Sequence, residues 1–185
     1  MKSLILASGS PRRKEILEQV GVAFSVMPSD VEEIITKEVP EEIVMELSRQ
    51  KAEDVYQKQE NKDVIVLGAD TVVAYEGKIL GKPKTKEEAK EMLRSLSGQK
   101  HFVYTGVTLI GKNGRETFYD ETIVEFYLMN EEEIDAYVES GEPMDKAGAY
   151  GIQGKAAAFI KGIEGDYYNV MGLPIAKVLR NLQKM

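Results

Sequence analysis

The chain has 185 residues, of which 43% are hydrophobic and 30% are charged. This composition is typical of a globular protein and excludes a disordered one, and the length suffices for one domain with a substantial core or for two small lobes sharing one. The net charge of −7 disfavours extended DNA or RNA binding, because general nucleic-acid-binding proteins are usually basic.

The sequence contains no cysteine and one histidine, His101. Disulfides, thiolate catalysis and cysteine-ligated metal sites are therefore excluded. A Ser-His-Asp triad would need His101, for which the sequence identifies no partner, so we interpret this residue as structural. A bound metal would need carboxylates and other oxygen ligands, which suit Mg²⁺ or Mn²⁺.

No apolar run approaches the roughly 20 residues needed to cross a bilayer. The apolar run Leu4-Ile5-Leu6 is too short for the core of a signal peptide, and Arg12 and Arg13 follow it closely. We therefore expect a first β-strand here, no membrane association and a cytoplasmic protein.

Short β and α segments alternate along the chain, which predicts an α/β fold with a mixed sheet flanked by helices. The predicted strands are residues 4–8, 24–27, 63–70, 102–110, 116–126 and 157–163, with 71–75 continuing the third strand or pairing with it. The predicted helices are residues 11–21, 40–57, 85–96 and 130–140, and a last one that Pro174 opens. Residues 144–155 are predicted to form a glycine-rich loop.

Two turns are predicted from their residue types. Glu76-Gly77 suits a tight turn, and Asn113-Gly114 is a strong signal for a hairpin between two long strands. The long hairpin could pair with another chain, as in a homodimer, or could lie inside the sheet.

The segment from Ser8 to Arg13 predicts an anion site at a strand-to-helix turn. Ser10 suits the N-cap and Pro11 the first helical position, which places Arg12 and Arg13 in the first turn. That is the unfavourable end for cations, unless an anion binds there to serine hydroxyls, backbone N–H groups and both guanidinium groups. The alternative is a capped helix with two solvated arginines.

Two further residues interrupt apolar patterns. Asp70 ends a buried strand, where α/β folds place ligands, and otherwise it is a turn-forming aspartate. Lys51 lies in the apolar stripe of its helix, and it either extends to solvent or points into a cleft.

Three loops contain further residues that could bind a ligand or a metal. Lys82, in Gly81-Lys82-Pro83, can hold an ammonium group near a ligand, or can belong to a plain surface turn. Glu32 and Glu33 could bind a metal together with Asp70, or could be solvated loop acids. Gln153 lies in a loop rich in glycine and could bind a base edge, or the loop could be a flexible connector.

Taken together, these segments resemble the Maf family of septum-formation-associated nucleoside triphosphate pyrophosphatases. The resemblance covers nearly the whole chain. It is carried by Ala7-Ser8-Gly9-Ser10-Pro11-Arg12-Arg13-Lys14-Glu15-Ile16-Leu17, Lys51-Ala52, Gly68-Ala69-Asp70-Thr71-Val72-Val73, Gly81-Lys82-Pro83, Leu96-Ser97-Gly98, Asp145-Lys146-Ala147-Gly148-Ala149-Tyr150-Gly151-Ile152-Gln153-Gly154 and Gly172-Leu173-Pro174.

The resemblance implies one two-lobed domain over residues 1–185 with a deep cleft, similar to inosine triphosphate pyrophosphatases. It implies that Asp70 is the catalytic proton acceptor and that Arg12, Thr71 and Gln153 choose the base, in the combination of the branch acting on dTTP and UTP. We prefer Glu33 to Glu32 as the second carboxylate.

The expected reaction is hydrolysis between the α- and β-phosphates, with a divalent cation, Mg²⁺ or Mn²⁺, held by Glu33 and Asp70. Arg13, Lys51 and Lys82 would neutralise the triphosphate, with hydrogen bonds from Ser8 and Ser10. The family also implies a role in cell-division arrest or in clearing non-canonical nucleotides. The alternative is a nucleotide-binding regulator of septum formation without turnover.

Overall fold

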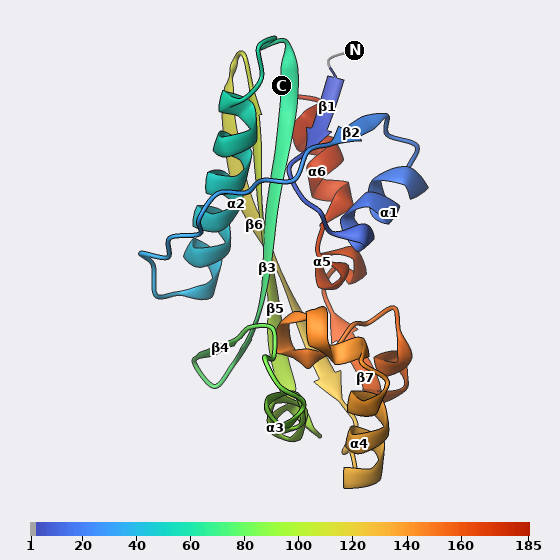
Figure 1. Ribbon diagram of the computed structural model, residues 1–185. Helices are drawn as coiled ribbons and strands as arrows, with labels where there is room; N and C mark the ends of the chain where they lie inside the picture. Colours follow the sequence, from blue (N-terminus) through green and yellow to red (C-terminus); the bar gives the residue numbers. More distant parts are fainter. Residues whose placement is uncertain (1–2) are drawn as a thin grey trace. The chain divides into compact units, whose positions relative to one another are not determined.

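The computed structural model describes residues 3–185 of the chain (Figure 1). The strands are β1 (Ser3–Leu6), β2 (Phe24–Val26), β3 (Val64–Tyr75), β4 (Lys78–Leu80), β5 (Lys100–Gly111), β6 (Gly114–Phe126) and β7 (Ile160–Glu164). The α-helices are α1 (Pro11–Gln19), α2 (Pro40–Gln57), α3 (Lys86–Leu96), α4 (Glu131–Glu139), α5 (Tyr167–Met171) and α6 (Ile175–Leu182). Three short 3₁₀ helices are η1 (Glu142–Asp145), η2 (Ala147–Ala149) and η3 (Lys155–Phe159).

In the described part of the chain, seven strands form one mixed sheet. Their order is β2-β1-β3-β5-β6-β7, and β4 pairs with β3. Strand β1 is parallel to both of its neighbours, whereas the β3–β4 and β6–β7 pairs are antiparallel. The prediction of a mixed α/β fold is confirmed.

The chain divides into two compact units, each assembled from separate segments. The first unit contains Met1–Asp70, Thr105–Asp120 and Gly172–Met185, and the second contains Thr71–Tyr104 and Glu121–Met171. The predicted single domain with a deep cleft stays a prediction. No helix among residues 3–185 is long and apolar enough to span a bilayer.

In the first unit, helix α2 packs closely on the sheet. Figure 1 shows α2 on one side of β3, with α1 and α6 on the other. A Cβ atom on Gly68 of β3 would overlap the carbonyl oxygen of Ser48, and one on Gly106 of β5 would overlap that of Val44. These two glycines therefore allow the helix backbone to approach the strands. The approach positions the residues of α2 that face β3.

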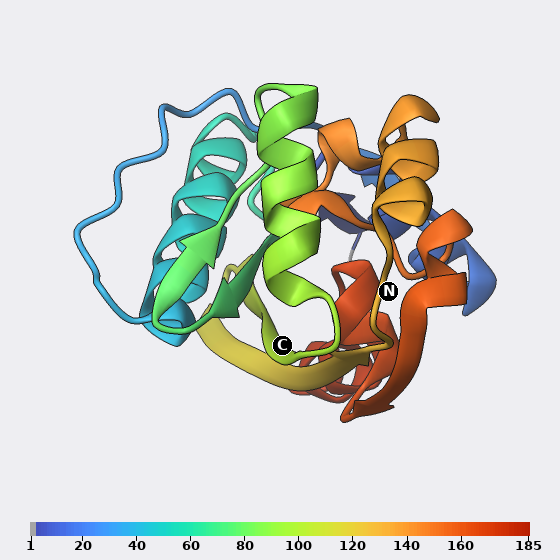
Figure 2. The ribbon, with the colours of Figure 1, turned by 90° about the horizontal axis from the view of Figure 1, so that it is seen from below.

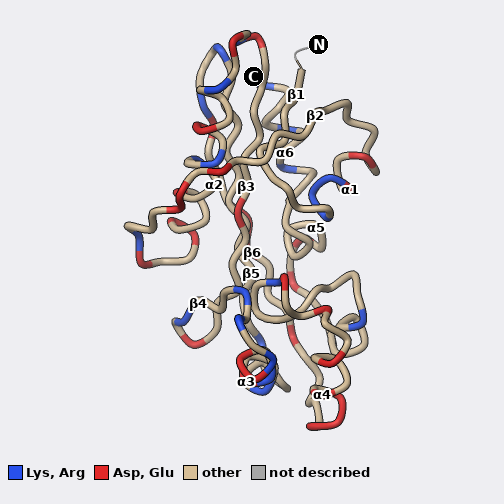
Figure 3. The backbone as a smooth tube through the Cα atoms, viewed as in Figure 1, with Lys and Arg blue, Asp and Glu red and all other residues tan. Residues whose placement is uncertain are grey.

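In the second unit, α3 and α4 lie side by side, as Figure 2 shows. Their inward faces share a buried apolar cluster that includes Leu93, Phe126 and Tyr137. Three ion pairs join the outer edges of the two antiparallel helices. They are Lys86 with Glu139, Lys90 with Asp135 and Arg94 with Glu131. In Figure 3, α3 accordingly carries both basic and acidic residues.

His101 is fully buried in the second unit. Its Nε2 atom lies 2.7 Å from the hydroxyl oxygen of Tyr150, and its ring contacts those of Phe126 and Tyr150 edge to face. Burial lowers the pKa of His101 to about 4, so the ring is neutral at pH 7. This environment supports the structural interpretation, and Tyr150 is the partner that the sequence did not identify.

The predicted turns agree with the structure. Glu76 and Gly77 both have positive φ, 48° and 73°, as a hairpin turn of type I′ requires. The hairpin at Asn113 joins β5 to β6, and Gly114 opens β6 with a φ of 146°.

Residues 71–75 continue β3, which is the first of the two alternatives predicted for them. Two other predictions about elements were incomplete or wrong. The strand predicted from residue 157 begins at Ile160, because the alanine-rich segment before it forms η3, as alanine favours helical conformations. Helix α5 was not predicted, although Asp166 carries the signal: its Oδ1 accepts a hydrogen bond from the backbone N–H of Tyr168.

Candidate active site

The turn from β1 to α1 has the predicted local structure. Ser10 is the N-cap, its hydroxyl oxygen accepts a 3.5 Å hydrogen bond from the backbone N–H of Arg13, and Pro11 is the first helical residue. The first turn contains no acidic residue, and Figure 3 shows basic residues where α1 begins. The helix dipole and the arginines therefore add positive charge at the same place.

Arg13 is anchored by groups of the first unit. Its Nη1 atom donates a 3.0 Å hydrogen bond to Ser8 Oγ, and its Nε atom donates a 2.8 Å hydrogen bond to the carbonyl oxygen of Gly172. Burial lowers the pKa of Arg13, and the negative charges of Asp70 and Glu33 oppose this effect. Because an arginine keeps its charge, Arg13 is a fixed cation in the field of two carboxylates.

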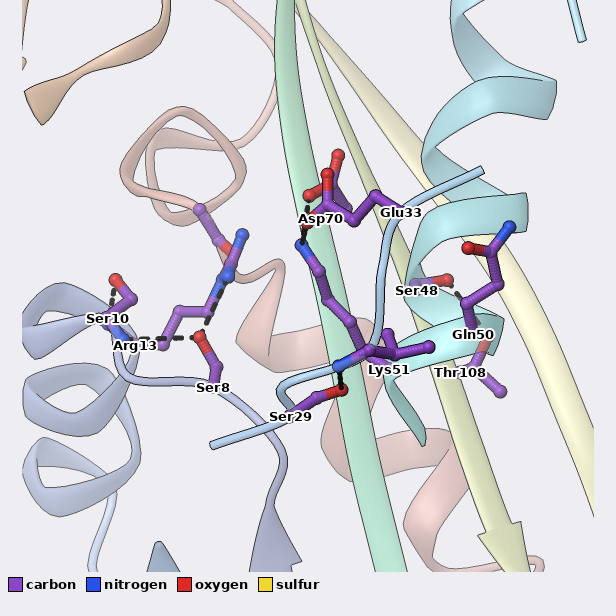
Figure 4. Close-up of polar contacts among 12 residues, drawn as sticks. Ser8, Ser10, Arg13, Ser29, Glu33, Ser48, Gln50, Lys51, Asp70 and Thr108 are labelled. Atoms are coloured by element: carbon purple, nitrogen blue, oxygen red, sulfur yellow. Dashed lines mark hydrogen bonds and ion pairs between the residues drawn. The ribbon is translucent and has the colours of Figure 1, made fainter. Parts of the chain in front are cut away.

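Lys51 points at Asp70 and not into free solvent. Its Nζ atom lies 2.6 Å from Asp70 Oδ1 and 2.8 Å from Glu33 Oε1. The side chains of Lys51 and Asp70 are only 18% and 14% exposed, and that of Glu33 is 46% exposed. Figure 4 shows the three side chains converging from α2, from β3 and from the segment before α2. One ammonium group therefore bridges two carboxylates.

Asp70 lies within β3, and the prediction that it ends a strand was wrong. The strand continues to Tyr75. A carboxylate inside a sheet needs a compensating partner, and Lys51 on the adjacent helix supplies it. With its charge compensated in this way, Asp70 does not interrupt the strand.

Of the two adjacent loop acids, the structure brings Glu33 to Asp70. Glu33 contacts the same lysine as Asp70, and both Glu32 and Glu33 lie in a segment without regular secondary structure. This geometry agrees with the preference for Glu33. Its role as a metal ligand stays a prediction.

The acidic pair fits a divalent cation held with help from other oxygens. Among residues 3–185, no group of three or more histidine, cysteine, aspartate or glutamate side chains is placed to hold a metal. Glu33 and Asp70 nevertheless already share one cationic partner, the ammonium group of Lys51. Mg²⁺ is commonly bound by one or two carboxylates plus water and substrate phosphates, which matches this pair.

Of the remaining predicted residues, Arg12 lies in the first turn of α1, and the other three belong to the second unit. Thr71 is half-buried in β3, whereas Lys82 and Gln153 are exposed. The backbone N–H of Gly148 donates a 3.1 Å hydrogen bond to the carbonyl oxygen of Gly81. The turn that carries Lys82 is thus joined to the glycine-rich loop that carries Gln153.

Glu142 was not singled out from the sequence, although it shapes the Gln153 loop. Its two carboxylate oxygens accept hydrogen bonds from the Tyr137 hydroxyl, at 3.1 Å, and from the backbone N–H of Lys155, at 3.1 Å. A Cβ atom on Gly154 would overlap the same carboxylate. The sequence signal for this contact was Gly154. A glycine in a loop indicates that another group approaches the backbone closely, but it does not identify that group.

The sheet order and its helices define a class of fold that is also found in the Ham1 protein of Staphylococcus aureus. The TM-score is 0.57 at 14% sequence identity, over 99% of each chain, so this likeness concerns the fold. The family model of Maf-like proteins matches residues 3–185, and the chain belongs to this family.

Curated relatives match the chain over its full length. A protein of Agathobacter rectalis named dTTP/UTP pyrophosphatase is 55% identical, over 100% of this chain and 98% of its own. A protein of Bacillus anthracis with the same name is 57% identical, over 100% of this chain and 96% of its own.

Proposed function

We propose that this protein is a nucleoside triphosphate pyrophosphatase that hydrolyses dTTP and UTP to the monophosphate and pyrophosphate. The observation that carries the proposal is the cluster of Lys51, Asp70 and Glu33 in the field of Arg13. It combines a carboxylate that can act as a base with cations that can stabilise negative charge, and hydrolysis of a phosphoanhydride bond can use both. Full-length relatives with the name dTTP/UTP pyrophosphatase support the choice of substrates.

In the proposed mechanism, Asp70 orients the attacking water and accepts its proton. Lys51 and Arg13 stabilise the negative charge of the phosphates, and they are already held in place before substrate binds. Arg13, held by Ser8 and Gly172, therefore needs no reorganisation during the reaction. The roles of Lys82 at the phosphates, and of Arg12, Thr71 and Gln153 at the base, belong to the proposal because of the family resemblance.

Glu33 and Asp70 are the residues that we propose to hold a divalent cation, Mg²⁺ or Mn²⁺. When bound, such a cation neutralises phosphate oxygens and lowers the pKa of a coordinated water. Phosphate oxygens then attract Lys51 away from Asp70, so that the carboxylate becomes available to the water.

The decisive experiment compares canonical and modified nucleoside triphosphates with Mg²⁺ and Mn²⁺, scoring pyrophosphate separately from phosphate. We expect equal amounts of monophosphate and pyrophosphate, with dTTP and UTP as preferred substrates. Release of phosphate alone would contradict cleavage between the α- and β-phosphates. Nucleotide binding without product over hours would favour a regulator of septum formation that does not turn substrate over.

We further propose a cytoplasmic role in clearing unwanted pyrimidine nucleotides or in restraining cell division. A strain that carries an inactive variant separates the two roles. If division arrest persists when turnover is abolished, the effect on division depends on nucleotide binding and not on hydrolysis.

A further inference from the structure

Residues 28–39 contain no regular secondary structure, yet side chains of α2 bind them along their length. The α2 residues involved are spaced four apart, which places them on one face of the helix. They are Glu46, Gln50 and Asp54, and the row continues with Lys58, the C-cap residue of α2. We call this row the strap residues.

Gln50 forms the central contact of the row. Its Oε1 atom accepts a 3.0 Å hydrogen bond from the backbone N–H of Ile34, and its Nε2 atom donates a 2.6 Å hydrogen bond to the carbonyl oxygen of Ile34. One side-chain amide thus pairs with both backbone groups of one residue, as a neighbouring strand would. The backbone of Ile34 is therefore fixed in position and in orientation.

The other strap residues hold the two ends. The carboxylate of Glu46 accepts hydrogen bonds from the backbone N–H of Thr36, at 2.8 Å, and from its hydroxyl, at 2.6 Å. Asp54 accepts a 2.7 Å hydrogen bond from the Ser29 hydroxyl, and Lys58 pairs with Asp30.

Apolar burial does not explain how the middle of the segment is held. Ile34 and Ile35 are 60% and 57% exposed. Hydrophobic side chains that stay in water contribute little to fixing a loop. The polar contacts with α2 therefore carry most of the restraint at this point.

The position of Gln50 links this restraint to the candidate active site. Ile34 follows Glu33 directly, and Lys51 follows Gln50 directly. Gln50 therefore fixes the backbone one residue away from Glu33, on the helix that presents Lys51 to Glu33 and Asp70. Figure 4 shows Gln50 and Lys51 on neighbouring positions of α2.

We propose that Gln50 is a positioning residue that acts through Glu33, holding this carboxylate beside Lys51 and Asp70. The effect on catalysis rests on the proposed function, whereas the restraint on the backbone does not. Gln50 does not contact the reacting atoms. Its influence must therefore disappear when Glu33 no longer carries its charge.

The test uses Gln50→Met, which keeps the side-chain length and removes both hydrogen bonds to Ile34. Gln57→Ala is the matched control, because Gln57 lies on the same helix, is exposed and is outside the strap residues. Hydrogen exchange of the Ile34 amide, measured by NMR, reports the restraint without any need for activity. The melting temperature of each variant shows whether the fold is intact.

We expect exchange at Ile34 to become roughly tenfold faster in Gln50→Met, since an ordinary hydrogen bond corresponds to about a factor of ten in an equilibrium. We expect no change in Gln57→Ala. Unchanged exchange in Gln50→Met would overturn the proposal at its first step, because the segment would then be held by something else.

A double-mutant cycle tests the second step. Gln50→Met is expected to lower kcat/KM for dTTP about five- to tenfold in the native background, and less than about twofold in a Glu33→Gln background. Equal losses in both backgrounds would show that Gln50 does not act through Glu33. If the native protein forms no product, the proposed function fails, and the same cycle is then measured on nucleotide affinity.

Discussion

The Nζ atom of Lys51 lies 2.6 Å from Oδ1 of Asp70, although the two residues are 19 positions apart in the chain. The same nitrogen lies 2.8 Å from Oε1 of Glu33. Two carboxylates thus share one ammonium group at the point where we propose that water is activated. The charge of each partner can be removed separately, which makes the cluster testable.

Asp70→Asn keeps the shape of the side chain and removes the proposed base. We expect kcat for dTTP to fall at least about 100-fold, the lower range for loss of a general base. Asp135→Asn is the control, because this residue is an exposed ion-pair partner of Lys90. Near-normal turnover in Asp70→Asn, with the fold intact by circular dichroism, would remove Asp70 from the mechanism.

Lys51→Met removes the cation between Glu33 and Asp70. The two carboxylates then lack their compensating charge, and a divalent cation should replace it. We expect Mn²⁺ to raise the melting temperature of Lys51→Met more than that of the native protein, because binding to the folded state alone stabilises it. Lys90→Met, which affects an ion pair of the second unit, should respond to Mn²⁺ as the native protein does. An equal response in all three proteins would argue against a shared cation position.

Because the ring of His101 is buried, we expect the stability of the protein to depend on pH. Its pKa is lowered by burial from 6.5 to about 4, so the unfolded chain binds a proton more readily than the folded one between these values. Stability from this residue is therefore complete above about pH 6.5 and is lost as the pH falls toward 4 and below, by roughly 3 kcal/mol in all.

The measurement is the free energy of unfolding by urea at several pH values. His101→Gln lacks the titrating ring, so its stability should fall less than that of the native protein between pH 6.5 and pH 4.5. Parallel curves for the two proteins would contradict the neutral state of the buried ring.

Gly106→Ala tests the close approach of α2. The added Cβ atom would overlap the carbonyl oxygen and carbon of Val44, and backbone atoms cannot move aside as a flexible side chain can. We expect a loss of about 3 kcal/mol in the free energy of unfolding, the upper end of the usual range for overpacking. Gly162→Ala is the control, because a Cβ atom there meets no atom within 4 Å. Similar stability of the two variants would contradict the packing described for α2.

Glu142→Ala tests the support of the Gln153 loop. The change removes the acceptor for Tyr137 and for the backbone of Lys155, so the loop should lose its fixed position. We expect the ratio of kcat/KM for dTTP to that for dGTP to fall at least about threefold, as loss of one ordinary hydrogen bond permits. Glu139→Ala, which removes an exposed partner of Lys86, should keep the ratio unchanged. A fall in overall rate without a change in the ratio would separate Glu142 from the choice of base.

The local structure around the first turn could be predicted from the sequence because capping acts over a few residues. Ser10, Pro11 and Arg13 are near neighbours, and their roles follow from the preferences of helix N-termini. The hairpin at Asn113-Gly114 and the turn at Glu76-Gly77 follow for the same reason. Where short-range preferences competed, as in the alanine-rich segment before Ile160, the predicted boundary was wrong.

The sequence predicted which residues belong to the candidate site, but it predicted only part of how they are arranged in space. The sequence left Lys51 between solvent and a cleft, and it left Glu32 and Glu33 as alternatives. The direction of each side chain depends on contacts with distant segments, which spacing along one helix or loop does not specify. The strap residues show the same limit, since their four-residue spacing is visible in the sequence but their partners in residues 28–39 are not.

The sequence by itself determined the class of fold, the positively charged turn at Ser8 to Arg13 and the resemblance to a family. Each of these depends on local preferences or on motifs that are read in order along the chain. Only the tertiary structure decided that Lys51 bridges Asp70 and Glu33, that Asp70 lies inside a strand, and that Gln50 holds the backbone beside Glu33. The physical reason is that charges and hydrogen bonds act over a few ångströms in space, and folding alone determines which distant residues come that close.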